Sequence, residues 1–270
     1  MIAPLRDLHL FADGREIALG CRMALLAQET LTLRPAQHHL EIHDLSASSA
    51  ALLSESRNLE VRSGHSILAF GEPAEVVTCL RSGRRLTSVV FSFGLSLWQS
   101  SISLSVSAGM KVSDTIRAIL SAAVPGAAAR APDTSAAPTA TSVPAIPLAA
   151  YTARDPVLTR PQAFFGRTCD ALTLLAETAD ADIFLSSAGL CVSGKEERTP
   201  ALFIPENTLL SEPVRTGDRL LLTTSVLGWP LGARARTELK GTELSGRPVS
   251  RLIQADNGDG PWKSELELEV

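Results

Sequence analysis

Short apolar runs with a period of two dominate the first third of the sequence. Turns rich in Gly, Pro, Ser and Arg bound these runs, which is typical of β-strands. The predicted strands cover residues 8–11, 16–19, 31–33, 40–42, 59–62, 67–70, 75–80 and 86–93. Between the first two runs lies Asp13-Gly14, a dipeptide that favours a tight hairpin turn. Residues 102–106 alternate cleanly and predict one more strand with a single buried face.

In two places the apolar residues recur with the period of a helix. The predicted N-terminal cap is Ser113 for the first helix and Thr168 for the second. The apolar face of the first helix is formed by Ile116, Ile119 and Leu120. The apolar face of the second is formed by Leu172, Leu175, Ala176 and Ala179. Seven of the 16 prolines fall within residues 125–161. Because proline lacks the backbone donor, we expect an extended loop there, with neither a helix nor a central strand.

Strands return after the second helix. The predicted elements are a hairpin of 182–185 with 190–193, a strand at 219–226, and a hairpin of 248–255 with 262–270 around a turn at 256–260. In the last run, the positions expected to face a core are Trp262, Ser264, Leu266, Leu268 and Val270. The alternate positions, expected to face solvent, a lumen or a basic neighbour, are Lys263, Glu265, Glu267 and Glu269.

The stretch His39 to His43 has the residue types of a metal site. On a strand, His39, Glu41 and His43 share one face, and the two apolar residues between them share the other. A third element that completes the ligand set is not identifiable, so we interpret this face as solvated and expect no metal. The continuation after Ser46, a predicted cap, indicates a short helix at 46–53.

Three further stretches have residue types found in chemical sites. Residues 94–98 begin like a nucleophile elbow around Ser96, but Trp98 replaces the final Gly and no helical pattern follows. Residues 256–260 fit a hairpin turn better than a calcium loop, because glycines occupy two ligand positions. The Glu196-Glu197 pair lies in a polar string and is interpreted as a solvated loop. We therefore predict no catalytic, cofactor-binding or metal-ligating residues and no cofactor.

Composition narrows the function classes. A hydrophobic content of 45% with 20% charge predicts a folded chain, and aromatic residues make up only 4%. The net charge of -4 and the few aromatic rings argue against specific nucleic-acid binding, and the basic cluster at 81–85 is interpreted as a loop between strands. We expect no signal peptide, no membrane span, and synthesis in a cytoplasm. The cysteines, expected to be buried free thiols, are Cys21, Cys79, Cys169 and Cys191.

The order of several phrases resembles the baseplate hub proteins of phage tails. Residues 42–46 read Ile-His-Asp-Leu-Ser, and a short predicted helix, a strand and the phrase at 70–76 follow, as in the first barrel of that family. Asp44 stands where Asn is usual, and Pro73-Ala74 lengthens the second phrase. The other similar segments are 101–120, 166–192 and the closing hairpin at 246–268. The resemblance covers most of the chain except residues 121–160.

The resemblance implies a mainly β (α+β) fold of two small β-barrel domains with an inserted α/β portion. The expected domains are an N-terminal barrel at 1–106, the insertion at 107–185 and a C-terminal barrel at 186–270. It also implies a structural hub of a phage tail or phage-like particle, made in the host bacterium, that forms a ring and lines the DNA conduit. The implied partners are two further copies of the chain, the tail tube or distal tail protein, the tip, spike or central fibre protein, and the tape-measure protein.

Two other classes remain open at this stage. One is a tail-associated enzyme such as a peptidase or esterase, against which the missing nucleophile–base pattern counts. The other is a stand-alone carbohydrate-binding β module, which would call for exposed aromatic platforms, whereas the chain has three Trp and one Tyr. A threefold mass in solution favours the hub, and a monomer favours the module.

Overall fold

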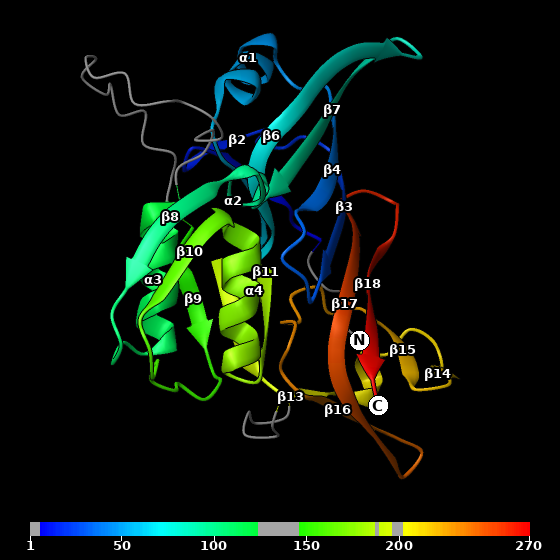
Figure 1. The fold of residues 1–270 in the computed structure, drawn as a ribbon. Coiled ribbons are helices and arrows are strands. Elements are labelled where there is room, and N and C mark those ends of the chain that lie inside the picture. The colour runs from blue at the N-terminus through cyan, green and yellow to red at the C-terminus, as the bar shows by residue number, and fades with distance from the viewer. Residues whose placement is uncertain (1–5, 124–145, 187–188, 196–201) are drawn as a thin grey trace, which may run out of the picture. The chain divides into compact units, whose positions relative to one another are not determined.

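Strands make up most of the computed structural model, which describes residues 6–123, 146–186, 189–195 and 202–270 (Figure 1). The chain divides into two compact units. The first unit comprises Met1–Leu31, Pro35–Phe93 and Thr199–Val270, and the second comprises Thr32–Arg34 and Gly94–Arg198. The limits of these units differ from the predicted domain boundaries after residues 106 and 185. The division into three domains stays a prediction. No helix among the described residues is both long and apolar enough to cross a membrane.

The first unit is built on a 13-stranded sheet. Its strands are β1 (His9–Ala12), β2 (Arg15–Ile17), β3 (Met23–Thr30), β4 (Ala36–His43), β5 (Leu59–Ser63), β6 (Ser66–Arg81), β7 (Arg84–Phe93), β13 (Leu202–Ile204), β14 (Val214–Thr216), β15 (Arg219–Thr224), β16 (Ala235–Leu239), β17 (Thr242–Asp256) and β18 (Trp262–Glu269). The main path runs β14-β15-β18-β17-β3-β4-β7-β6-β5-β1-β2, and β16 links β13 to β17. Chain segments from both ends of the sequence therefore share one sheet, joined where β3 pairs with β17.

The mainly β class predicted from the sequence is confirmed. The path of the sheet is open, however, because the described end strands β14 and β2 do not pair with each other. The described strands thus do not close into the two predicted barrels.

Two tight hairpins of the first unit follow from their turn residues. Asp13 and Gly14 have φ values of 48° and 79°, the left-handed pair that the predicted Asp-Gly turn requires. Ser82 and Gly83, with φ of 51° and 78°, join β6 to β7 in the same way. The predicted loop at 81–85 is therefore confirmed as a turn between two strands, but its flanking arginines belong to the strands.

Three sequence predictions in this unit need correction or extension. The predicted strand at 31–33 is wrong, because the chain bends there after β3 has ended at Thr30. The strand β3 itself was missed, since the charged Glu29 interrupts its alternation at a buried position. Residues 67–70 and 75–80 belong to the single strand β6, which passes Pro73 through a register shift before Glu75.

The short helix predicted after Ser46 is confirmed as α1 (Ala47–Glu55). Ser46 is its N-cap, and its Oγ accepts a hydrogen bond of 3.1 Å from the backbone N–H of Ser49. Leu53 is buried on the inner side of the helix, where it joins the main core cluster of the unit. That cluster also contains the large buried side chains Phe91 and Leu10.

The second unit combines helices with two small sheets. Its elements are α2 (Leu95–Gln99), β8 (Ser101–Val106), α3 (Val112–Ala122), β9 (Leu148–Tyr151), β10 (Gln162–Arg167), α4 (Thr168–Thr178), β11 (Ala181–Ser186) and β12 (Gly189–Gly194). β8 pairs with β10, and the other sheet has the order β11-β12-β9. The predicted helices, the strand at 102–106 and the hairpin of 182–185 with 190–193 are confirmed, and α3 packs against α4 (Figure 1).

The predicted loop at 125–161 holds only in part. Residues 124–145 lie outside the described residues. Within the remainder, the short strand β9 pairs in parallel with β12, contrary to the expectation of a loop without regular structure. Pro147 and Pro156 flank β9 and do not interrupt it. Because β9 is an edge strand, only one side of its backbone pairs with a neighbouring strand.

The predicted helix caps differ from the observed ones. Ser113 lies inside α3, whose N-cap is Lys111. The carboxylate of Asp155 instead accepts hydrogen bonds from the backbone N–H of Ser113, at 2.9 Å, and from its hydroxyl, at 2.8 Å. Similarly, Thr168 is the first residue of α4, and its side chain bonds to the hydroxyl of Ser100 at 2.6 Å. In both helices the polar residue at the start is held by a partner distant in sequence.

Candidate interaction surface

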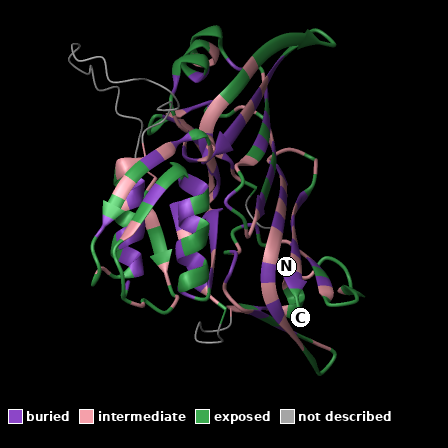
Figure 2. Cartoon of the chain, in the orientation of Figure 1, coloured by how far each residue is buried: buried purple, intermediate pink, exposed green. Residues whose placement is uncertain are grey.

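The two faces of the large sheet have opposite character. Along β4, the side chains of His38, Leu40 and Ile42 are buried, whereas His39 and Glu41 are exposed. Figure 2 shows buried and exposed residues interleaved along the strands of the sheet. The same alternation continues on the neighbouring strands because the pairing register is continuous across β17, β3, β4 and β7. One face therefore holds the core, and the other is available for contacts.

The open face mixes apolar and charged side chains. Register places on it Glu265 and Glu267 of β18, Leu252 of β17, Leu26 and Gln28 of β3, His39 and Glu41 of β4, and Val77 of β6. Leu26 is 42% exposed and Val77 46% exposed. These exposed apolar positions lie among polar and charged side chains on the same face.

The C-terminal hairpin was predicted correctly in outline. Trp262, Leu266 and Leu268 are buried, and the alternate positions of β18 lie on the open face. Val270 is 52% exposed and lies just beyond β18, so its predicted core position is wrong. Of the acidic side chains, only Glu269 is fully on the outside.

Glu265 and Glu267 are half-buried and already have partners. The Glu265 carboxylate lies 2.6 Å from the ammonium of Lys263. Glu267 accepts a hydrogen bond of 2.9 Å from the Ser250 hydroxyl and lies 3.9 Å from the guanidinium of Arg219. The sheet thus supplies its own basic neighbours to part of the predicted acidic face.

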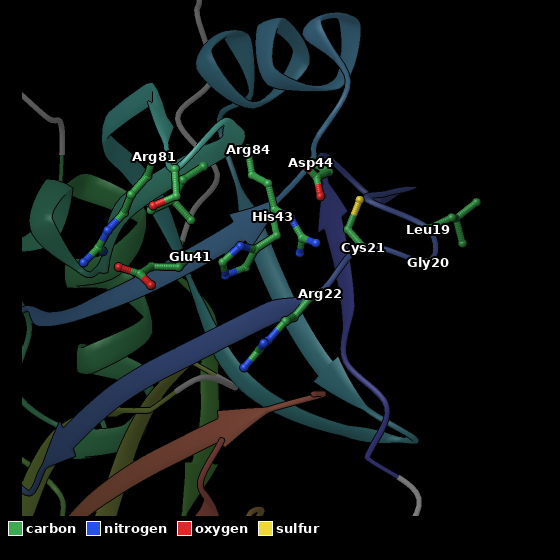
Figure 3. A pocket seen from close by; sticks show the side chains of 11 residues that line it. Leu19, Gly20, Cys21, Arg22, Glu41, His43, Asp44, Arg81 and Arg84 are labelled. Carbon is green, nitrogen blue, oxygen red and sulfur yellow. The ribbon is translucent and has the colours of Figure 1, made fainter. Parts of the chain in front are cut away.

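A hollow lies on the same face of the first unit, beside the β6–β7 turn. It has a volume of about 610 Å³ and is lined by Leu19, Gly20, Cys21, Arg22, Glu41, His43, Asp44, Arg81, Ser82, Arg84 and Leu86. Figure 3 shows that the side chains lining it belong to three parts of the chain: the β6–β7 hairpin, β4, and the segment that leads into β3. We call it the β6–β7 hollow.

The predicted metal-type residues fall at this place. His39, Glu41 and His43 do share the face that faces away from the core, as the period-two pattern predicted. Glu41 and His43 line the β6–β7 hollow together with arginines. Among the described residues, His, Cys, Asp and Glu side chains do not gather in any group of three or more that could hold a metal ion.

A buried polar cluster lies on the opposite, core face where β3 joins β17. Glu29 and Arg251 are each 4% exposed, occupy directly paired positions and form an ion pair at 2.6 Å. Arg251 also donates to the carbonyl oxygen of Trp229 at 2.6 Å. Sequence reasoning missed this cluster, and the only local signal is a charged residue at an expected core position of each strand.

His38 is the third member of this cluster. Its ring packs against that of Phe91, tilted by 54°, with the centroids 5.1 Å apart. Burial lowers the pKa of His38 from 6.5 to about 4, and the positive charge of Arg251 acts in the same direction. His38 is therefore neutral in the folded protein at neutral pH.

The turn at 256–260 closes the same joint at its other end. Asp256 pairs with the guanidinium of Arg22 at 2.9 Å and accepts a hydrogen bond from the backbone N–H of Gly258. Burial alone would raise the pKa of Asp256, but these two hydrogen bonds outweigh it and lower the pKa. The Asn257 side chain accepts from the backbone N–H of Met23. The stretch is a hairpin turn bound to β3, as predicted in preference to a calcium loop.

The elbow-like stretch itself forms the short helix α2, which begins directly after Gly94, whose φ is 81°, and ends at Gln99. The next element is the strand β8, so no helix follows the stretch, as predicted. A Cβ at Gly94 would clash with the buried side chain of Leu185, so this position needs glycine for space as well as for conformation. All five histidines of the chain belong to the first unit, so the unit that carries Ser96 has no histidine to serve as its base.

The remaining candidates add no site. All four cysteines are free, as predicted, but only Cys169 is buried, where desolvation raises the pKa of its thiol to about 11. Cys79 is exposed because it lies on the outer half of the β6–β7 hairpin, where few residues pack against other elements. Glu196 and Glu197 lie outside the described residues.

Comparisons with known proteins find similar folds among solved structures and no match by sequence. No protein-family model matches the sequence, and no curated protein matches it. Among solved structures, a tail protein from Neisseria meningitidis MC58 matches with a TM-score of 0.66 at 14% identity, covering 97% of this chain and 95% of that one. The 43 kDa tail protein of prophage MuSo2 from Shewanella oneidensis matches with a TM-score of 0.65 at 10% identity, covering 97% and 96%.

A third match extends the similarity to secretion systems. The E. coli c3393 protein, a type VI secretion component described as similar to the T4 bacteriophage tail proteins gp27 and gp5, matches with a TM-score of 0.58 at 7% identity. The match covers 97% of this chain and 76% of that protein. This chain therefore has the fold of phage tail proteins, and the resemblance identified from the sequence is confirmed at that level.

Proposed function

We propose that this chain is a structural hub protein in the baseplate or tail tip of a phage tail or phage-like particle. The observation that carries the proposal is the extent of the fold match, since nearly all of this chain and nearly all of two tail proteins superpose as one continuous fold. Function does not follow from fold alone, and the surface of the chain is the second support. Its open sheet face is suited to contacts between proteins.

The proposed role is mechanical and not enzymatic. Glu41 and His43 lie together in the β6–β7 hollow, but the described residues include no group of three or more His, Cys, Asp or Glu side chains that could hold a metal ion. A hub needs a rigid body, and the 13-stranded sheet that unites both ends of the chain supplies one. Its proposed partners are the tail tube or distal tail protein on one side, the tip, spike or central fibre protein on the other, and the tape-measure protein.

A ring of such subunits would line a conduit for DNA. A conduit must let DNA pass without binding it. A chain with a net charge of -4 has no overall excess of cationic side chains to neutralise the DNA phosphates. Within the sheet, Glu265 and Glu267 have basic partners, and Glu269 is exposed at the end of β18. The net negative charge of the chain supports, in the proposed ring, a wall that does not retain DNA.

We expect the purified protein to form a homotrimer in solution. Light scattering coupled to size-exclusion chromatography should then give about 86 kDa, three times the chain mass of 28.6 kDa. The experiment should be repeated over a range of concentrations, because an interface formed only in the particle assembles weakly when isolated. A mass of one chain at every concentration would contradict the trimer and favour a stand-alone module.

A further inference from the structure

The tip of the β6–β7 hairpin places two arginines together on one face. Arg81 is the last residue of β6 and Arg84 the first of β7, and the two are directly paired across the turn. Paired residues of an antiparallel hairpin point to the same side, so both side chains reach the β6–β7 hollow (Figure 3). Arg22 contributes a third guanidinium from the opposite side of the hollow.

These two arginines lack the acidic partners that the other arginine of the hollow has. Arg22 is paired with Asp256. The side chains of Arg81 and Arg84, by contrast, are exposed and form neither an ion pair nor a hydrogen bond with the described residues. Residues 76–93 contain three arginines and no acidic residue, although the whole chain is acidic. The tip is therefore a local cationic site that an acidic ligand would complement.

Apolar side chains accompany this charge. Leu19 lines the hollow and is 75% exposed, and Leu86 lines it from β7 and is buried. An exposed leucine in the same hollow as unpaired arginines indicates a partner that brings both carboxylates and an apolar side chain, which is the chemistry of an acidic polypeptide.

The same lining argues against a nucleic acid. Glu41 and Asp44 stand in the hollow among the arginines, where they would repel a continuous row of phosphates. Its lining contains no Trp, Tyr or Phe on which a base could stack. A peptide can place its carboxylates at Arg81 and Arg84 and avoid the two acidic residues.

We propose that the β6–β7 hollow is a docking site for an acidic segment of another protein. Carboxylates of that segment pair with Arg81 and Arg84, and an apolar side chain between them covers Leu19. His43, next to these groups, donates a further hydrogen bond to a carboxylate from its ring. This assignment does not depend on the hub role, because the site is a property of the isolated chain.

The test uses a labelled octapeptide that alternates Glu with Leu and Gly, titrated against the purified full chain by fluorescence anisotropy. Arg81→Glu/Arg84→Glu is compared with Arg15→Glu/Arg57→Glu, which changes the net charge equally at exposed arginines outside the hollow. We expect the first double variant to weaken peptide binding roughly tenfold and the second to change it less than about twofold. The same peptide with Gln in place of Glu should bind weakly to all three proteins.

Each alternative result has a defined meaning. Equal weakening by both double variants would overturn the proposal, because binding would then follow net charge. The proposal also fails if the wild-type chain does not bind the peptide at low salt. A double-stranded DNA oligonucleotide serves as the second probe, and tighter binding of DNA than of peptide, lost in Arg81→Glu/Arg84→Glu, would reassign the tip to nucleic acid. Matching circular dichroism melts exclude misfolding as the cause.

Discussion

Replacing Arg251 by Met is expected to lower the free energy of unfolding of the first unit by about 3–5 kcal/mol. The guanidinium and the Glu29 carboxylate are both almost fully buried and lie 2.6 Å apart. Removal of the guanidinium takes the Arg251 countercharge away from a buried carboxylate, and also removes the hydrogen bond that Arg251 donates to the Trp229 carbonyl. Urea denaturation followed by circular dichroism measures the change.

Two control variants separate this effect from a loss of packing. The double variant Glu29→Leu/Arg251→Met should recover most of the lost stability, because it removes both charges and keeps the volume. Arg117→Met removes an exposed ion pair with Asp114 and should cost less than about 1 kcal/mol. If Arg251→Met costs no more than Arg117→Met, the buried pair does not exist in solution.

The buried pair matters because of where it lies. β3 and β17 are separated by more than two hundred residues of sequence, and their pairing joins the N-terminal and C-terminal strands of the first unit. Arg22 and Asp256 pair at the far end of the same joint. Ion pairs at defined positions fix the register of two strands, since a shift by one residue would place these charges on the opposite face.

His38 is expected to make the protein sensitive to acid. The pKa of His38 in the folded state, about 4, lies below its ordinary value of 6.5, so between these values the unfolded chain binds the proton more readily. Stability is thus unaffected above about pH 7 and falls as the pH drops from 6.5 towards 4. A pKa lowered from 6.5 to about 4 corresponds to a loss of about 3 kcal/mol at pH 4.

The matched variants are His38→Leu and His39→Leu. The first replaces the buried ring by an apolar side chain, and it should remove this acid-dependent loss between pH 6.5 and 4. The second changes the neighbouring histidine on the exposed face of β4, and it should keep the acid dependence of the wild type. Urea midpoints measured across this pH range give the comparison. An unchanged pH profile in His38→Leu would show that another group causes the acid sensitivity.

Turn dipeptides, period-two alternation and helical spacing are enough to predict the elements that these local patterns mark. Asp13-Gly14 gave the first hairpin, the alternation after Trp262 gave the last strand, and the helical spacing around Leu172 gave α4. Each of these depends on residues close together in sequence. The mainly β fold class followed from the sum of such signals.

The missed features depend on partners far away in the chain. Strand β3 is missed by the local pattern because Glu29 occupies a core position, and its ion pair with Arg251 on β17 shows how a charge is accommodated there. The cap of α3 comes from Asp155 and not from the serine within the helix. No local pattern reveals either partner, because both are brought near only by the tertiary fold.

The β6–β7 hollow also combines features that the local sequence reveals with features that only the tertiary fold creates. The basic character of residues 81–85 is visible in the sequence, and so is the turn that they flank. The hollow itself requires Leu19 and Arg22, which approach the hairpin only because β3 lies beside β4 in the sheet. The sequence therefore predicted the charge but not the cavity.

The copy number of this chain in purified particles tests most directly whether it is a structural part of a tail. Quantitative mass spectrometry of density-gradient-purified particles from the bacterium that encodes the chain would compare its peptides with those of the tail tube protein. A trimeric hub predicts three copies of the chain in each particle. Particles that are complete and functional but contain no copy of this chain would contradict the proposed function.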